Sequence, residues 1–125
     1  MKRQEESKTE RLFWSLAAEL MRESPTVVEG TIMNGRCLRV GEEFLALVDY
    51  KGSGLVVKLT AERVAALVAA GTGQPFAPAG RVFKEWVSVP EPDRRRWGAL
   101  LREGALLAKK SGAGKDRRQP RPRNR

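Results

Sequence analysis

Histidine is absent from this chain of 125 residues, and cysteine occurs only once, at Cys37. The absence of histidine excludes imidazole chemistry and the usual histidine-containing zinc sites. A single cysteine cannot form a disulfide within the chain, and we expect Cys37 to be a small buried hydrophobic residue. The candidate catalytic carboxylates, Glu29, Asp49, Glu62 and Glu85, are scattered without evident pairing. The sequence therefore predicts a protein that is not an enzyme and needs neither metal nor cofactor.

The sequence also lacks an apolar run long enough to span a membrane. Its first residues, Met-Lys-Arg-Gln-Glu-Glu, are too charged for a signal peptide. We therefore expect a soluble cytoplasmic protein. A chain of 125 residues with 41% hydrophobic residues is enough for one domain with one modest core.

Acidic residues are scarce at the C-terminal end. Residues 109–125 hold eight basic residues and one acid, a net charge of +7 out of +9 for the whole chain, which leaves +2 for residues 1–108. Residues 110–125 contain no aliphatic or aromatic side chain larger than alanine, so they cannot bury enough apolar surface to offset the entropy of ordering. We predict an α+β domain over residues 1–109 and a disordered basic tail over residues 110–125.

The basic tail is the functional feature with the strongest physical support. Flexible lysine and arginine residues neutralise phosphates without reading bases, so the tail is predicted to bind nucleic acid without sequence preference. The alternative is a terminus that only improves solubility. The candidate contacts are Lys109, Lys110, Lys115, Arg117, Arg118, Arg121, Arg123 and Arg125.

Hydrophobic periodicity predicts an antiparallel sheet framed by helices. Apolar residues at helical spacing indicate an opening helix over residues 5–22, and short β-rich runs separated by turn residues follow it. Asn34-Gly35 favours a tight hairpin. The expected strands are Val27–Ile32, Arg36–Val40, Phe44–Tyr50 and Gly54–Leu59.

The second half of the chain is predicted to complete the sheet and its helical cover. Thr60 can cap a helix that runs to Ala70, where Gly71 ends it. A glycine- and proline-rich crossing then leads to a fifth strand, Arg81–Val89. A third helix follows over about 93–109, and its inward stripe is expected to consist of Trp97, Leu100, Leu101 and Ala108. We expect an α+β fold in which about five antiparallel strands carry helices on one face.

The fifth strand contains the best candidates for a binding site in the domain. Arg81, Lys84 and Glu85 are predicted to be either a solvated strand face or a contact for an anion, small ligand or partner. Trp86 and Trp97 could stack on nucleic-acid bases, but core packing is the more common role of such residues.

The run Gln-Pro-Phe-Ala-Pro-Ala-Gly-Arg-Val-Phe-Lys-Glu-Trp-Val-Ser-Val-Pro over residues 74–90 resembles the signature of the TfoX N-terminal (TfoX/Sxy) family. That signature is approximately Pro-Phe, a short spacer, Gly-Arg, an apolar residue, Met, Lys or Arg, any residue, and Trp or Tyr. Residues 44–59 and the helix over 61–70 are also similar, so the resemblance covers about 27–108. Ile32-Met33-Asn34-Gly35 departs from the Met-Phe-Gly that members often carry.

The resemblance implies a small bacterial regulatory or interaction module, in a family linked to competence regulation. A broader similarity to the MmcQ/YjbR group, often described as DNA-binding, is fainter. Two hypotheses follow. The first is a non-enzymatic module whose tail binds nucleic acid, and the alternative is a small-ligand- or anion-binding domain that uses the Gly-Arg-Val-Phe-Lys-Glu-Trp strand.

Overall fold

The computed structural model describes residues 8–32, 35–49, 54–77 and 80–118. Three helices and six strands follow in the order α1 (Lys8–Glu23), β1 (Val27–Ile32), β2 (Gly35–Val40), β3 (Glu43–Asp49), β4 (Gly54–Lys58), α2 (Ala61–Ala69), β5 (Gln74–Pro75), β6 (Trp86–Val89) and α3 (Arg94–Arg118). The strands form one antiparallel sheet in the order β1-β2-β3-β4-β6-β5. The predicted α+β class and antiparallel sheet are confirmed.

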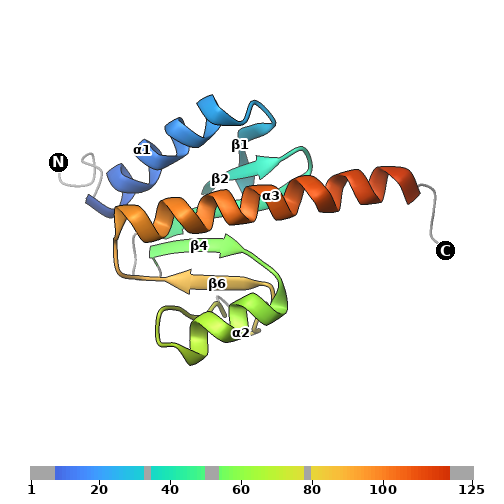
Figure 1. Cartoon of the computed structure of the whole chain (residues 1–125). Helices are drawn as coiled ribbons and strands as arrows, with labels where there is room; N and C mark the ends of the chain where they lie inside the picture. The colour runs from blue at the N-terminus through green and yellow to red at the C-terminus, as the bar shows by residue number, and fades with distance from the viewer. Residues whose placement is uncertain (1–7, 33–34, 50–53, 78–79, 119–125) are drawn as a thin grey trace.

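The three helices share one face of the sheet, as expected (Figure 1). Side chains of α1, α2 and α3 meet the inward side chains of the strands in one hydrophobic cluster. Trp97 of α3 and Phe13 of α1 are fully buried in it. In α3, the predicted inward residues Trp97, Leu100, Leu101 and Ala108 are all buried. The periodicity of the sequence therefore identified the correct face of the helix.

Local signals set several boundaries correctly. The hydroxyl of Thr60 accepts a hydrogen bond of 3.1 Å from the backbone N–H of Arg63 and caps α2, and Gly71 follows the helix with a φ of 80°. β1 and β2 pair with Ile32 opposite Gly35, in agreement with the predicted hairpin, whose Asn34 lies outside the described residues.

The prediction of one long strand over Arg81–Val89 was wrong. Only Trp86–Val89 forms a strand, and Lys84 and Glu85 lie in a turn. Gly80, with a φ of 82°, redirects the chain, and the backbone N–H of Phe83 donates to the carbonyl of Phe76. The chain therefore loops outward before it joins the sheet.

The number of strands was also underestimated. Gln74 and Pro75 form β5, which pairs with β6 through Ser88 and Val87, so the sheet has six strands instead of about five. The sequence places these residues in a crossing because proline cannot donate to a ladder. Pro75 is tolerated because β5 is the outermost strand.

The prediction that the third helix ends near Lys109 was wrong, because α3 is helical to Arg118. Its 25 residues give a length of about 37 Å at about 1.5 Å per residue. No proline occurs between Arg94 and Pro120, and extending a helix that is already nucleated costs little per residue. The assigned helix therefore continues into the basic segment, whereas residues 119–125 lie outside the described residues.

The sheet face away from the helices carries a second, smaller hydrophobic cluster. Cys37 is fully buried there, as predicted for a small hydrophobic residue. Phe76 and the partly buried Phe83 and Trp86 cover it, and Phe44 stacks on Trp86 with a ring centroid distance of 4.1 Å. The outward loop before β6 thus supplies aromatic cover for this face.

Candidate functional site

The C-terminal turns of α3 extend past the sheet (Figure 1). The helix packs on the core as far as Ala108, which is buried, and Lys109 is exposed. Of the eight basic candidates, five lie on this end of α3 and three follow it outside the described residues. The five are Lys109, Lys110, Lys115, Arg117 and Arg118, and the three are Arg121, Arg123 and Arg125.

Positive charge suits this end of a helix. The carbonyl groups of the last turn carry a partial negative charge, so nearby cations are favourable. Asp116 is the one acid in residues 109–125. The projecting end therefore combines a dense positive charge with a position beyond the packed part of the sheet.

The packed part of the molecule differs because several of its basic residues pair with acids. In the residues that the structure describes, six ion pairs form: Arg36–Glu29 at 2.6 Å, Lys58–Glu43 at 3.2 Å, Arg63–Glu103 at 2.9 Å, Arg96–Asp93 at 3.9 Å, Arg102–Glu23 at 2.9 Å, and Arg94–Glu19. Such pairs cancel charge locally. The field that could attract an anionic polymer therefore arises mainly at the C-terminal end.

Two of these pairs perturb the ionisation of their members. A hydrogen bond from Arg102 lowers the pKa of Glu23, and the same bond raises the pKa of Arg102. A hydrogen bond from Arg36 likewise lowers the pKa of Glu29. All four side chains are about half exposed, so these pairs hold α1 to α3 and β1 to β2 without burying charge.

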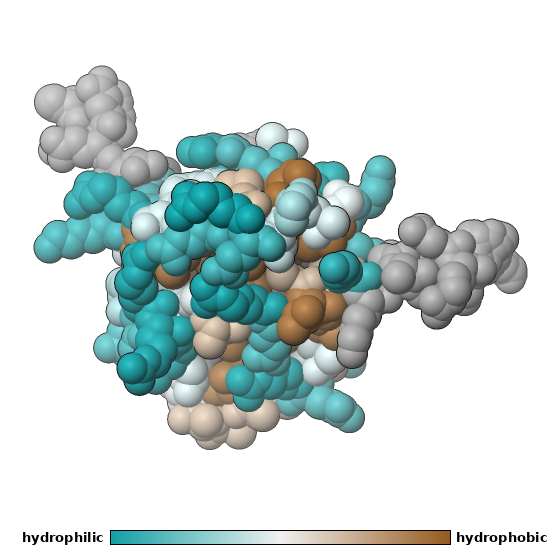
Figure 2. All heavy atoms as spheres, turned by 45° about the horizontal axis from the view of Figure 1, so that its top comes forward, coloured by the Kyte–Doolittle hydropathy of each residue, from teal (hydrophilic) through white to brown (hydrophobic). Residues whose placement is uncertain are grey.

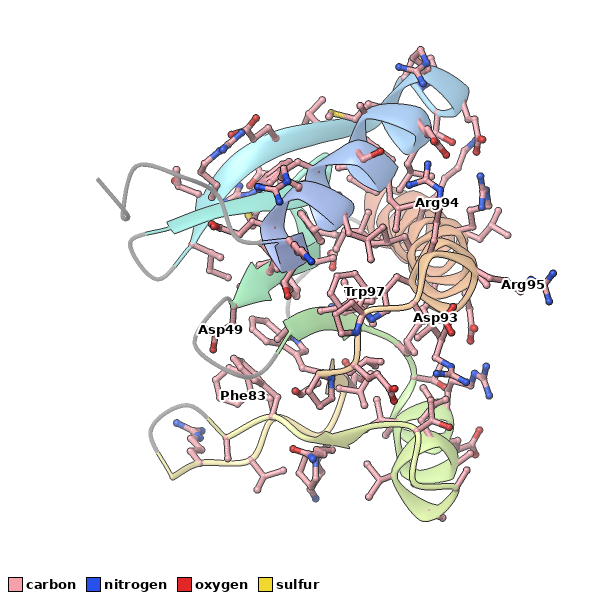
Figure 3. All side chains as sticks on the ribbon, turned by 90° about the vertical axis from the view of Figure 1, so that its left-hand side faces the viewer. Asp49, Phe83, Asp93, Arg94, Arg95 and Trp97 are labelled. Atoms are coloured by element: carbon pink, nitrogen blue, oxygen red, sulfur yellow. The ribbon has the colours of Figure 1, made fainter. Side chains whose placement is uncertain are left out.

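The surface over α1 and α3 is mainly hydrophilic, with scattered hydrophobic residues between the charged ones (Figure 2). Figure 3 shows Arg95 pointing away from the molecule at the start of α3, while Trp97 points inward. Large exposed hydrophobic side chains among the described residues are Val28, Val82 and Leu106. These belong to different elements and do not identify a docking surface.

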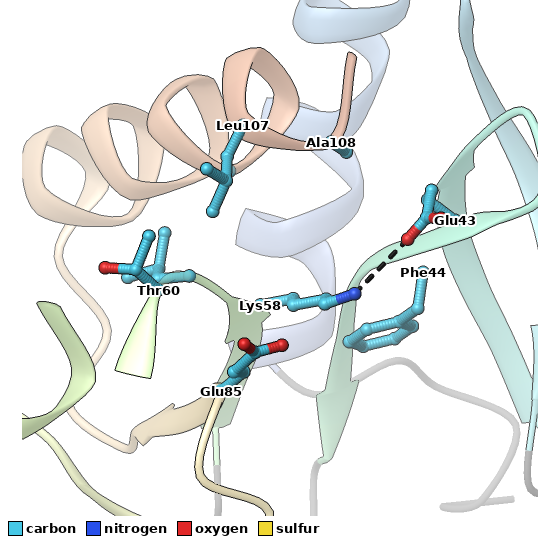
Figure 4. A pocket seen from close by; sticks show the side chains of 9 residues that line it. Glu43, Phe44, Lys58, Thr60, Glu85, Leu107 and Ala108 are labelled. Carbon is cyan, nitrogen blue, oxygen red and sulfur yellow. Dashed lines mark hydrogen bonds and ion pairs between the residues drawn. The ribbon is translucent and has the colours of Figure 1, made fainter. Parts of the chain in front are cut away.

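A small pocket lies between α3 and the ends of β3 and β4 (Figure 4). Its volume is about 140 Å³. The lining residues are Glu43, Phe44, Lys58, Leu59, Thr60, Glu85, Gly104, Leu107 and Ala108. Polar groups gather at its base, where Lys58 pairs with Glu43, and Leu107 lies on the helical side.

The three candidates of the signature run are separated by this geometry. Arg81, Lys84 and Glu85 are all exposed, but only Glu85 lines the pocket. The structure brings Glu85 beside β4, because its carbonyl accepts a hydrogen bond of 2.9 Å from the backbone N–H of Leu59. Arg81 and Lys84 stay outside the cavity.

Glu43 and Lys58 are pocket residues that the sequence did not single out. They are 15 positions apart, and only the antiparallel pairing of β3 with β4 brings them together. Lys58 ends β4 and Glu43 begins β3. Neither residue has sequence neighbours that would indicate a pocket. Knowledge of the strand register would have been needed to find them.

The two candidate stacking residues have other roles. Trp97 is fully buried, which confirms the core assignment, and its indole Nε1 has no hydrogen-bond partner in the part of the chain that the structure describes. Trp86 is half-buried, and the rings of Phe44 and Phe76 stack on it at 4.1 and 5.6 Å between centroids. The indole of Trp86 is therefore already stacked within the protein.

The described residues contain neither a membrane-spanning helix nor a cluster of metal ligands. None of their helices has the length and apolar character needed to cross a membrane. They also contain no group of three or more acidic or cysteine side chains placed to hold a metal ion.

The chain matches no protein-family model, no curated protein and no solved structure. A function therefore has to be inferred from the residues themselves.

Proposed function

We propose that this chain is a small non-enzymatic module, similar to the TfoX N-terminal family, that acts as a regulatory or interaction protein in the cytoplasm. In this proposal it binds nucleic acid without sequence preference through the basic end of α3 and the residues after it. The observation that carries the proposal is the separation of charge. Residues 109–125 hold +7, and residues 109–118 form the projecting end of α3, whereas residues 1–108 hold +2.

The mechanism of binding is electrostatic. Lysine and arginine side chains displace the counterions that surround the phosphates, and this release supplies the affinity. Contacts from lysine and arginine to phosphate oxygens carry no information about the base sequence. The contacts therefore determine the affinity for nucleic acid but give no sequence preference.

The test compares the full chain with a chain that ends at Lys110, on duplexes of equal length and unrelated sequence. Full-length protein should bind them with equal affinity. If all eight basic residues contact phosphates, the logarithm of the affinity should fall by about 7 for each tenfold rise in salt, since each contact contributes about 0.9. Fluorescence anisotropy over a salt series measures both quantities.

A matched variant separates charge from chain length. Replacing Lys115, Arg117, Arg118, Arg121, Arg123 and Arg125 with glutamine keeps the length but removes the charge. We expect this variant and the truncated chain to lose binding equally and to keep the melting temperature of the full chain. Salt-resistant or sequence-selective binding by the truncated chain would place the contacts in the folded domain and overturn the proposal.

A further inference from the structure

Two small residues of α3, Gly104 and Ala108, line the pocket between this helix and the sheet. They lie one turn apart on the same side of α3. A Cβ atom at Gly104 would lie 3.1 Å from the carbonyl oxygen of Lys58 and 2.8 Å from Cδ1 of Leu45, so the helix touches the sheet closely there. The pocket lies beside this close contact.

The charged groups of the pocket are not balanced. Glu43 pairs with Lys58 at 3.2 Å, and the side chains are only 10% and 29% exposed respectively. Glu85 adds a second carboxylate to the lining. Figure 4 shows this carboxylate beside the aliphatic stem of Lys58. The lining residues thus hold two carboxylates and one ammonium group, which leaves one negative charge in excess.

The remaining walls are apolar. Phe44, Leu59 and Leu107 line the pocket together with Ala108. A volume of about 140 Å³ corresponds to four or five water molecules at about 30 Å³ each. A ligand of similar size would have about five non-hydrogen atoms. Burying its chain against these walls is favourable because it removes apolar surface from water.

We propose that this pocket binds a primary ammonium group on a short aliphatic chain, with the ammonium against Glu85 and the chain along the apolar lining that includes Leu107 and Ala108. The charge of the pocket favours a cation over an anion. A bound carboxylate would be repelled by Glu43 and Glu85, and the charge of Lys58 is already balanced by Glu43. The walls select an organic cation over a hydrated metal ion. A free amine and the side chain of a lysine offer the same chemistry.

The test titrates the full-length protein with three probes of matched size: butylammonium, butanol and butyrate. A fourth probe, lysine with blocked backbone ends, represents a chain-borne amine. We expect the amide signals of Lys58, Glu85 and Leu107 to shift in NMR spectra with butylammonium, the blocked lysine, or both, and not with butanol. A response to the blocked lysine alone assigns the pocket to a lysine of another chain, and a response to butylammonium alone assigns it to a free amine.

Glu85→Gln should weaken amine binding at least tenfold. Glu62→Gln is the matched control, because it removes the same charge from an exposed residue of α2 that does not line the pocket. Equal affinity in the two variants, a response to butyrate in place of the amines, or no response to any probe would overturn the proposal. Loss of nucleic-acid binding by the truncated chain has no bearing on this result, since the pocket residues all precede Lys109.

Discussion

The side chain of Arg39 lies directly over Gly30 on the neighbouring strand. A Cβ atom at Gly30 would be 2.8 Å from Nε and 2.9 Å from Cδ of Arg39. By crossing this glycine, the guanidinium group reaches the carbonyl oxygen of Thr31 and donates a hydrogen bond of 3.1 Å. β1 is an outer strand of the described sheet, with β2 on one side and no strand on the other. Arg39 therefore occupies a backbone carbonyl of this outer strand.

Removal of this contact should promote self-association. Outer strands offer free backbone groups to other chains, and charged side chains commonly obstruct them. At equal protein concentration, we expect a larger fraction of Arg39→Ala than of the wild type to form dimers or larger species. Gly30→Ala should act in the same direction, because its methyl group would displace Arg39. Sedimentation velocity measures the effect, and Arg95→Ala, which removes an exposed arginine from α3, serves as the control. Sedimentation of both variants identical to that of wild type would refute a protective role.

Two glycines of α3 should respond oppositely to alanine. A Cβ at Gly98 would have no neighbour closer than 3.4 Å, so Gly98→Ala should stabilise the protein by up to about 1 kcal/mol through helix propensity. At Gly104 the added methyl would meet Leu45 at 2.8 Å and a backbone carbonyl at 3.1 Å, and overpacking of this kind typically costs about 1–3 kcal/mol. Urea denaturation of the two variants gives the sign directly. A stabilised Gly104→Ala protein would show that α3 can move away from β4.

The two tryptophans should differ in their contributions to stability. Trp97 is fully buried among the helices and the sheet, so Trp97→Ala should cost about 3–5 kcal/mol. Trp86 is half-buried on the opposite face, and we expect a smaller loss for Trp86→Ala. Denaturant midpoints measured by circular dichroism would test this order. An unchanged midpoint for Trp97→Ala would be incompatible with its position in the core.

Acid should weaken the two glutamate–arginine pairs. The folded-state pKa values of Glu23 and Glu29 lie below the ordinary value of 4.5, so the native state holds these carboxylates ionised more strongly than the unfolded chain does. Their stabilisation is therefore present above pH 4.5 and is lost as the pH falls through the lowered values.

Replacing both residues with glutamine should accordingly reduce the loss of stability between about pH 6 and pH 3. Urea melts across this range measure the difference, with Glu62→Gln as a control that leaves both pairs intact. Identical pH profiles for the double variant and the wild type would show that these exposed pairs contribute nothing measurable to folding.

Local sequence determined most of the secondary structure of this protein. Helical periodicity located the inward face of α3, including Trp97, because packing depends on the spacing of apolar side chains. Thr60 and Gly71 marked the ends of α2, because capping and positive φ are properties of single residues. The concentration of charge after Ala108 is likewise a property of the sequence.

Tertiary structure decided the features that depend on residues far apart in the chain. The run before Trp86 resembles a strand, but the contacts of Phe83 with Phe76 and Trp86 favour a loop over the open face of the sheet. The pocket exists only because strand pairing joins Lys58 to Glu43 and because α3 approaches the sheet at Gly104. Short-range preferences act between neighbours along the chain, whereas these contacts depend on the register of the strands and the path of a helix across them.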